Sequence, residues 1–127
     1  MNLEVKSRLS RVVERIKSLD EEGKVQFVIL FGSSAVGDRS SMSDTDLAIG
    51  HEGTEEERFD FRVRVSGELH TDFDIKIFQD LPLYVKKEVL KGKVLYVRDI
   101  RQLHEIALET IRDYAFFEPV FLDYIQR

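Results

Sequence analysis

The sequence predicts an α+β fold around one hydrophobic core. Both ends of the chain carry apolar residues at helical spacing, and the middle carries four short apolar runs of strand character, at 26–31, 44–50, 73–78 and 94–97. A chain of 127 residues buries roughly two thirds of its unfolded surface, which is enough for one core but not for two. We therefore expect a single domain over residues 1–127.

The N-terminal segment is expected to form an amphipathic helix followed by a buried strand. Its apolar residues recur every three or four positions: Leu9, Val12, Val13, Ile16 and Leu19. Gly23 ends the connection, and the β-branched and aromatic run from Gln26 to Phe31 predicts the strand. At Gly32 the chain is expected to turn sharply.

The second strand carries two carboxylates on one face. Side chains at positions i and i+2 of a strand point to the same side, so Asp44 and Asp46 project together. The residues between and after them, Thr45, Leu47 and Ile49, pack on the opposite side. Two carboxylates in one place form a site for a hard divalent cation, and oxygen ligands of this kind suit magnesium.

Residues 54–69 carry two conflicting signals. Residues 59–66 alternate between apolar and polar types, which alone predicts a strand. Thr54 followed by Glu57, however, is a capping-box pattern, in which the two side chains satisfy backbone donors at a helix start. The cap favours a helix from about Glu55 to Leu69.

The third strand, Phe73 to Phe78, places its three odd-numbered apolar residues on one face and Asp74 and Lys76 on the other. A charged residue among apolar neighbours is costly unless it has a partner or a task. If this strand lies beside the strand of Asp46, Asp74 completes a cluster of three carboxylates. Three carboxylates would suit two-metal phosphoryl or nucleotidyl transfer, because that reaction needs ligands for both ions and a group that activates the attacking hydroxyl.

Two more helices and one more strand are expected after the third strand. Pro82 suits the first turn of a helix that Gly92 closes, and a short strand follows at 94–97. Asp99 with Gln102 is expected to cap the last long helix. The apolar stripe of that helix consists of Ile100, Leu103, Ala107, Ile111 and Tyr114.

The C-terminal region, from about residue 99 to 127, is a candidate partner-binding region. Eight large apolar side chains lie within the twelve residues 114–125, more than one face of a terminal helix easily buries against a small domain. Aromatic residues are enriched in the cores of interfaces. We take Phe117, Phe121 and Tyr124 as candidate partner-binding residues, with closure of the domain core as the alternative.

Gly32 and Ser33 form a candidate phosphate-binding turn. Backbone N–H groups exposed after a strand attract anions, a residue without a side chain allows close approach, and the Ser33 hydroxyl can donate to a phosphate oxygen. A triphosphate could then bridge Ser33 and a metal held by Asp44 and Asp46. A Gly-Ser pair alone is usually only a turn, but its spacing from the two aspartates makes the combination specific.

Two other readings of the aspartate pair are less suitable. A calcium-binding loop requires a further Asp or Asn and then Gly, where this chain has Ala48 and Ile49. A glycosyltransferase with an Asp-x-Asp motif needs a larger doubly wound sheet than 127 residues provide. The histidines His51, His70 and His104 fit no metal-ligand spacing and are expected at the surface.

These residues resemble the minimal nucleotidyltransferases of the DNA polymerase β superfamily, in particular the MntA-type antitoxins paired with HEPN-domain toxins. The matching positions are Gly32, Ser33, Ser43, Asp44, Asp46, Leu47 and Asp74. The segment 91–99 and the aromatic C-terminal end also look like the family. One position departs from it, because Val36 stands before Gly37 where many members carry a basic residue; Arg39 and Lys76 are the candidates to replace it.

The resemblance implies a polymerase-β-like nucleotidyltransferase fold, with a short mixed sheet flanked by helices, and it supports the helix near 55–69. It further implies transfer of AMP from ATP to a tyrosine hydroxyl of a HEPN ribonuclease toxin, which neutralises the toxin. By resemblance, Asp44, Asp46 and Asp74 are the catalytic residues and hold two Mg²⁺ ions. Gly32, Ser33 and Ser43 are the nucleotide-binding residues.

Two alternative functions remain open. A non-catalytic antitoxin would neutralise the toxin by complex formation alone, and an antibiotic-modifying nucleotidyltransferase would use a small-molecule hydroxyl as acceptor. The complete carboxylate set favours an enzyme over the first, and the lack of a second substrate-binding domain disfavours the other.

The composition of the chain limits the classes of partner and the cellular location that we expect. The net charge of -5 argues against a long nucleic acid, since sequence-independent binding relies on clustered Lys and Arg. No apolar stretch is long enough to span a membrane and no signal peptide is evident, so a cytoplasmic protein is expected. The absence of cysteine excludes disulfides and thiolate metal sites.

Overall fold

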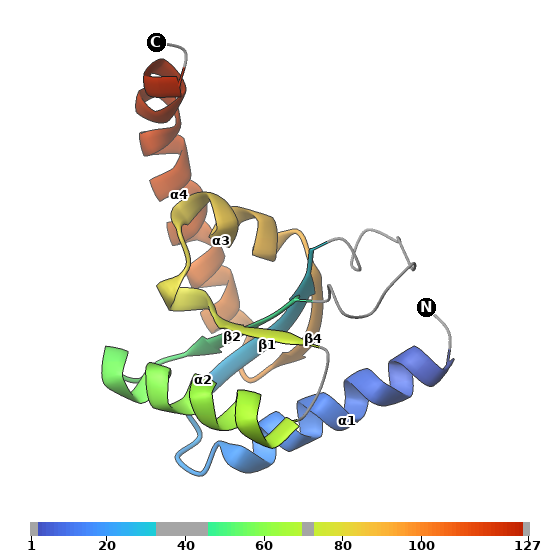
Figure 1. Ribbon diagram of the computed structural model, residues 1–127. Coiled ribbons are helices and arrows are strands. Elements are labelled where there is room, and N and C mark those ends of the chain that lie inside the picture. The colour runs from blue at the N-terminus through green and yellow to red at the C-terminus, as the bar shows by residue number, and fades with distance from the viewer. Residues whose placement is uncertain (1–2, 33–45, 70–72, 126–127) are drawn as a thin grey trace.

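The chain folds into one mixed β-sheet between two layers of helices (Figure 1). The structure is a computed structural model that describes residues 3–32, 46–69 and 73–125, with the backbone alone for Val5 and for 117–125. The elements, in chain order, are α1 (Leu3–Leu19), β1 (Val25–Phe31), β2 (Asp46–His51), α2 (Glu55–Leu69), β3 (Asp74–Ile77), the 3₁₀ turn η2 (Phe78–Asp80), α3 (Leu83–Leu90), β4 (Lys93–Val97) and α4 (Ile100–Ile125).

The sheet order is β3-β2-β1-β4. Strand β1 pairs antiparallel with both β2 and β4, whereas β2 pairs with β3 in parallel. This confirms the expected short mixed sheet and the α+β class. It also confirms that the strand of Asp74 lies beside the strand of Asp46.

Two apolar clusters fix the helices to the sheet, one on each face. Helices α1 and α2 cover one face, where the cluster includes Ile16, Leu47 and Val65. Helices α3 and α4 cover the other face, where the cluster includes Phe27 and Leu103. The N-terminal helix expected from its apolar spacing is confirmed, and it ends at Leu19, the last residue of that spacing.

Helix α2 resolves the conflict between strand-like alternation and the capping box. The Thr54 N–H donates to Glu57 Oε1 at 2.8 Å, and the Glu57 N–H donates to Thr54 Oγ1 at 3.2 Å. Phe61 and Val65, four residues apart, are buried, whereas Phe59 and Val63 are at least half exposed. The apolar residues at every second position suggested a strand. In the helix only those four residues apart, Phe61 and Val65, face the core, and the sequence pattern alone does not distinguish them from the exposed ones.

The start of α3 differs slightly from the expectation, whereas Gly92 closes the helix as predicted: it follows the C-cap Lys91, and its N–H donates to the Val89 carbonyl at 2.8 Å. Pro82 is the N-cap of α3 rather than part of its first turn, and its carbonyl accepts from Val85 N–H and Lys86 N–H. A Cβ on Gly92 would lie 2.3 Å from the Leu30 carbonyl oxygen. Glycine is therefore required because the connection between α3 and β4 passes directly against β1.

Helix α4 is a single helix that extends away from the sheet (Figure 1). Asp99 Oδ1 accepts from Arg101 N–H at 3.0 Å, while Gln102 Oε1 accepts from Arg98 Nη2 at 2.9 Å, so Gln102 serves the neighbouring arginine. Only part of the expected apolar stripe is covered. Leu103 is buried, but Ile100 and Ile111 are 51% and 55% exposed. Among the described helices, α4 included, none has the length and apolar character needed to cross a membrane.

Candidate active site

Three of the predicted site residues lie at one end of three neighbouring strands. Asp46 and Asp74, the first residues of β2 and β3, are paired in register. On the other side of β2, Asp46 is paired with Phe31, the last residue of β1, which Gly32 follows. The fold therefore brings Gly32, Asp46 and Asp74 together from segments separated by up to about a third of the chain.

Both carboxylates belong to the α3/α4 face of the sheet. Leu47 and Ile49 pack in the cluster under α1 and α2, and Ala48 packs in the cluster under α3 and α4. Because side chains alternate along a strand, Asp46 shares the face of Ala48, and its register partner Asp74 shares that face. Asp46 is half-buried and Asp74 is exposed, so both are placed where a substrate could reach them.

Gly32 provides the turn at the end of β1. Its φ of 92° lies in the left-handed region, which costs glycine little and strains residues that carry a Cβ. Gly32 is also exposed, as a backbone that must approach a phosphate should be. The sharp turn predicted at this position is thus confirmed, although its phosphate-binding role stays a prediction.

Within the described part of the chain, Lys76 forms an ion pair with a residue of the candidate site. Its Nζ lies 3.1 Å from Asp74 Oδ2, and the two side chains are 38% and 60% exposed. Lys76 is paired with Ala48, so it stands on the same face as Asp46 and Asp74. The i, i+2 spacing of Asp74 and Lys76 on a strand was the sequence signal for this contact.

The remaining predicted site residues lie outside what the structure describes. Ser33, Ser43 and Asp44 fall in the segment 33–45, together with the Val36 and Arg39 positions. Phe117, Phe121 and Tyr124 belong to α4 by their backbone, and their side chains are outside the description. The roles of all these residues stay predictions.

The donor set fits a hard divalent cation. No group of three or more metal-ligating side chains is found within the described ranges. Those ranges do place the carboxylates of Asp46 and Asp74 on opposed positions of adjacent strands, and Asp44 precedes Asp46 by two residues. One or two carboxylates, completed by water and substrate phosphates, are the usual ligands of Mg²⁺.

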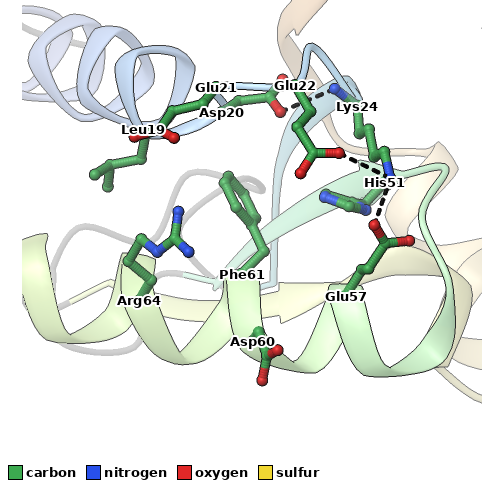
Figure 2. A pocket seen from close by; sticks show the side chains of 10 residues that line it. All are labelled: Leu19, Asp20, Glu21, Glu22, Lys24, His51, Glu57, Asp60, Phe61 and Arg64. Atoms are coloured by element: carbon green, nitrogen blue, oxygen red, sulfur yellow. Dashed lines mark hydrogen bonds and ion pairs between the residues drawn. The ribbon is translucent and has the colours of Figure 1, made fainter.

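A polar cavity lies at the end of the sheet opposite to Asp46 and Asp74 (Figure 2). It measures about 180 Å³ and lies beside His51, the last residue of β2, between α2 and the α1–β1 connection. Lys24 bridges Glu22 and Glu57 at this cavity, with Nζ···O distances of 3.1 and 2.5 Å. Hydrogen bonding to Lys24 is the main reason that the Glu57 pKa falls to about 2.

His51 contradicts the expectation of a surface histidine. It is only 4% exposed, and its Nδ1 accepts from the Gly53 N–H at 3.0 Å. Burial is the main cause that lowers its pKa. The sequence did contain evidence for this burial, because Leu47, Ile49 and His51 alternate along β2 and therefore lie on one face of the strand. Of the other histidines, His104 is exposed as expected, and His70 lies outside the described residues.

One curated protein is similar to this chain in sequence. A curated protein of Methanocaldococcus jannaschii, named as a candidate protein adenylyltransferase, is 33% identical over 82 residues. That match covers 65% of this chain and 63% of the relative, so the chain spans less than two thirds of the relative's length.

Two solved structures have a similar fold. One is a complex of tri-AMPylated Shewanella oneidensis HEPN toxin with MNT antitoxin, in which the matched chain gives a TM-score of 0.62 at 21% identity, covering 92% of this chain and 98% of that chain. The other is a toxin-antitoxin structure with AMP-PNP, whose matched chain gives a TM-score of 0.65 at 20% identity, with coverages of 91% and 97%. At these identities the likeness concerns the fold.

The family follows from a match that spans the whole sheet. The family model for polymerase beta nucleotidyltransferases matches residues 14–101, which contain β1 to β4 and the positions of all three predicted carboxylates. With the paired Asp46 and Asp74 beside the Gly32 turn, this chain belongs to the polymerase beta nucleotidyltransferase family.

Proposed function

We propose that this protein transfers AMP from ATP to a tyrosine hydroxyl of a cognate HEPN ribonuclease toxin and thereby neutralises the toxin. Family membership supports nucleotidyl transfer, and the name of the Methanocaldococcus jannaschii relative supports a protein acceptor. The AMPylated HEPN toxin in a structurally similar complex supports the class of acceptor. The observation that carries the proposal is the register that sets Asp46 opposite Asp74 beside Gly32.

The reaction joins the tyrosine oxygen to the α-phosphorus of ATP. The bond between that phosphorus and the oxygen bridging to the β-phosphate breaks, so pyrophosphate leaves as the phosphodiester forms. A tyrosine hydroxyl with a pKa of about 10 is largely protonated near neutrality and must lose its proton. We assign Asp74 to accept that proton, because it is the more exposed of the two described carboxylates and can be reached by an incoming side chain.

The other residues of the site would hold the nucleotide. Asp44, Asp46 and Asp74 would hold the metal ions, and bound Mg²⁺ supplies neutralisation of the phosphate charge. The Gly32 turn and the hydroxyls of Ser33 and Ser43 would donate to the phosphates as charge develops on the leaving group. Because ATP and the RNA targets of a ribonuclease are intracellular, we place the reaction in the cytoplasm.

Helix α4 would bring the partner to the same side of the sheet as the carboxylates. It packs on the α3/α4 face and then extends beyond the domain (Figure 1). Its apolar residues Leu108, Ile111 and Phe116 are 52%, 55% and 74% exposed. A toxin bound along residues 99–127, including the predicted contacts Phe117, Phe121 and Tyr124, could present a tyrosine to Asp46 and Asp74.

Transfer of label from α-phosphate-labelled ATP to a purified HEPN toxin tests the proposal. The wild-type protein should label the toxin, and the Asp46→Asn variant should not. The matched control is Asp60→Asn, because Asp60 is an exposed carboxylate on α2, on the opposite face of the sheet. Equal labelling by wild type and Asp46→Asn would contradict the assigned site.

The exposed apolar residues of α4 also favour a second candidate, an antitoxin that acts by binding alone. In that case Asp46→Asn would neutralise the toxin as well as the wild type does. Toxin activity measured with both proteins at equal concentration separates the two functions.

A further inference from the structure

We propose that Lys76 is a phosphate-binding residue of the nucleotide site, held by Asp74 until a metal ion takes that carboxylate. The proposal rests on the function proposed above and adds a residue to its binding site. It concerns a side chain whose contact, exposure and face are all described by the structure.

The position of Lys76 allows its ammonium to contact Asp74 or to turn away from it toward a phosphate. It follows Asp74 by two residues on β3, a separation of roughly 7 Å along the strand. Its flexible stem nevertheless brings Nζ to 3.1 Å from Asp74 Oδ2. A side chain that is 38% exposed has room to turn, so the ammonium can leave this carboxylate without disturbing the core.

Charge explains why the contact should change when ligands bind. In the ligand-free site, Lys76 offsets the repulsion between the neighbouring carboxylates of Asp46 and Asp74. A divalent cation on Asp74 would repel the ammonium, which then needs another anion nearby. The triphosphate of ATP is the strongest anion that the proposed site would hold, and lysine is a suitable point charge for phosphate.

The lysines of α3 and of its C-cap, on the same side of the sheet, have other contacts. The Lys86 ammonium lies 5.6 Å from the centre of the Phe78 ring, and the Lys87 ammonium lies 4.0 Å from that of Tyr114. Lys91 pairs with Glu88 at 3.4 Å. Lys76, by contrast, contacts a candidate metal ligand directly.

Lys76→Met tests this role, with Lys17→Met as the matched control. Lys17 has a similar exposure, 41%, and also pairs with a carboxylate, Glu14 at 3.7 Å, but it lies on α1 at the opposite face. Titration calorimetry would measure ATP affinity in Mg²⁺, and paramagnetic resonance would measure Mn²⁺ affinity without nucleotide. Neither measurement needs the transfer reaction.

We expect Lys76→Met to weaken ATP binding by about 10- to 100-fold, the range for one hydrogen bond to a charged group. Mn²⁺ alone should bind Lys76→Met more tightly than the wild type, since a competing cation has been removed. Lys17→Met should match the wild type in both measurements. Lys76→Arg, which keeps the positive charge, should recover most of the ATP affinity.

Two results would overturn the proposed role of Lys76, and only the second would also overturn the proposed function. Unchanged ATP affinity with tighter Mn²⁺ binding in Lys76→Met would mean that Lys76 only neutralises Asp74, and the proposed function would stand. A wild-type protein that binds neither Mn²⁺ nor ATP would overturn both the role of Lys76 and the proposed function.

Discussion

Asp46 and Asp74 occupy directly opposed positions on the parallel strands β2 and β3. They are separated by α2 in the sequence, so only the parallel pairing of the two strands brings their carboxylates together. The same register places Lys76 opposite Ala48. The chemistry of the site thus depends on a parallel contact at one edge of a short sheet.

Asp46→Asn should abolish transfer while leaving the fold intact. Asparagine has nearly the same shape as aspartate and can still form hydrogen bonds, so the melting temperature should stay close to that of the wild type. Transfer should fall by about 1,000-fold or more, as expected for loss of preorganised transition-state stabilisation. Circular dichroism and a transfer assay on the same sample check both parts. Wild-type rates at matched magnesium would refute the assignment of Asp46.

Gly32→Ala and Gly67→Ala should change stability in opposite directions. At Gly32 the φ of 92° strains an alanine, so unfolding should become easier by about 1–2 kcal/mol. At Gly67, within α2, an added Cβ meets nothing within 4 Å, and alanine should stabilise by about 0.5–1 kcal/mol. Urea unfolding of the two variants measures this contrast. Equal shifts of the same sign would show that the Gly32 turn is not strained.

Gly32→Ala should also weaken ATP binding, whereas Gly67→Ala should leave it unchanged. The methyl group at Gly32 would stand where the backbone is proposed to approach a phosphate. Calorimetry with ATP and Mg²⁺ provides the measurement. If Gly32→Ala binds ATP as the wild type does, the turn serves the fold alone.

His51 should make the protein less stable as the pH falls below about 6.5. Because burial lowers the folded-state pKa of His51, the unfolded chain takes up its proton first, and stability is lost as the pH drops toward the folded pKa. His51→Gln should reduce this dependence, and His104→Gln, at an exposed position, should retain it. Urea unfolding between pH 5.5 and 7.5 tests the difference. Identical pH slopes for wild type and His51→Gln would remove His51 as the cause.

Helix α4 should bind the toxin through its exposed apolar residues. Replacing Leu108, Ile111 and Phe116 with serine should remove toxin capture with little loss of stability, because each is more than half exposed. The control is Phe59→Ser with Val63→Ser, an exposed apolar pair on α2 at the opposite face. A pull-down with calorimetry of ATP binding on the same variants gives the result. Loss of capture in the α2 control alone would move the interface to the other face.

Local signals in the sequence predicted most of the elements. The Thr54–Glu57 capping box, together with the family resemblance, predicted α2 correctly against an opposing alternation; the two hydrogen bonds of the box form within four residues. The alternation of 73–78 predicted β3 and the shared face of Asp74 and Lys76. Such signals succeed where the deciding contacts are near in sequence.

Long-range contacts explain the features of the structure that the sequence did not predict. The apolar spacing of α4 could not show which of its residues meet the sheet, so Ile100 and Ile111 proved exposed while Leu103 is buried. Gly92 was correctly predicted as a helix end, but its close approach to Leu30 could not be predicted because it depends on how β1 and α3 are packed. The in-register pairing of Asp46 with Asp74 likewise arises from tertiary structure, although their strand positions could be predicted.

Mass spectrometry of a cognate HEPN toxin, after incubation with this protein, ATP and Mg²⁺, tests the central claim most directly. The account predicts a toxin heavier by one or more AMP groups, mapped to a tyrosine-containing peptide, with one pyrophosphate released per AMP. Asp46→Asn should leave the toxin mass unchanged, and Asp60→Asn should behave as the wild type. An unmodified toxin that the wild-type protein nevertheless neutralises would contradict catalysis and establish neutralisation by binding.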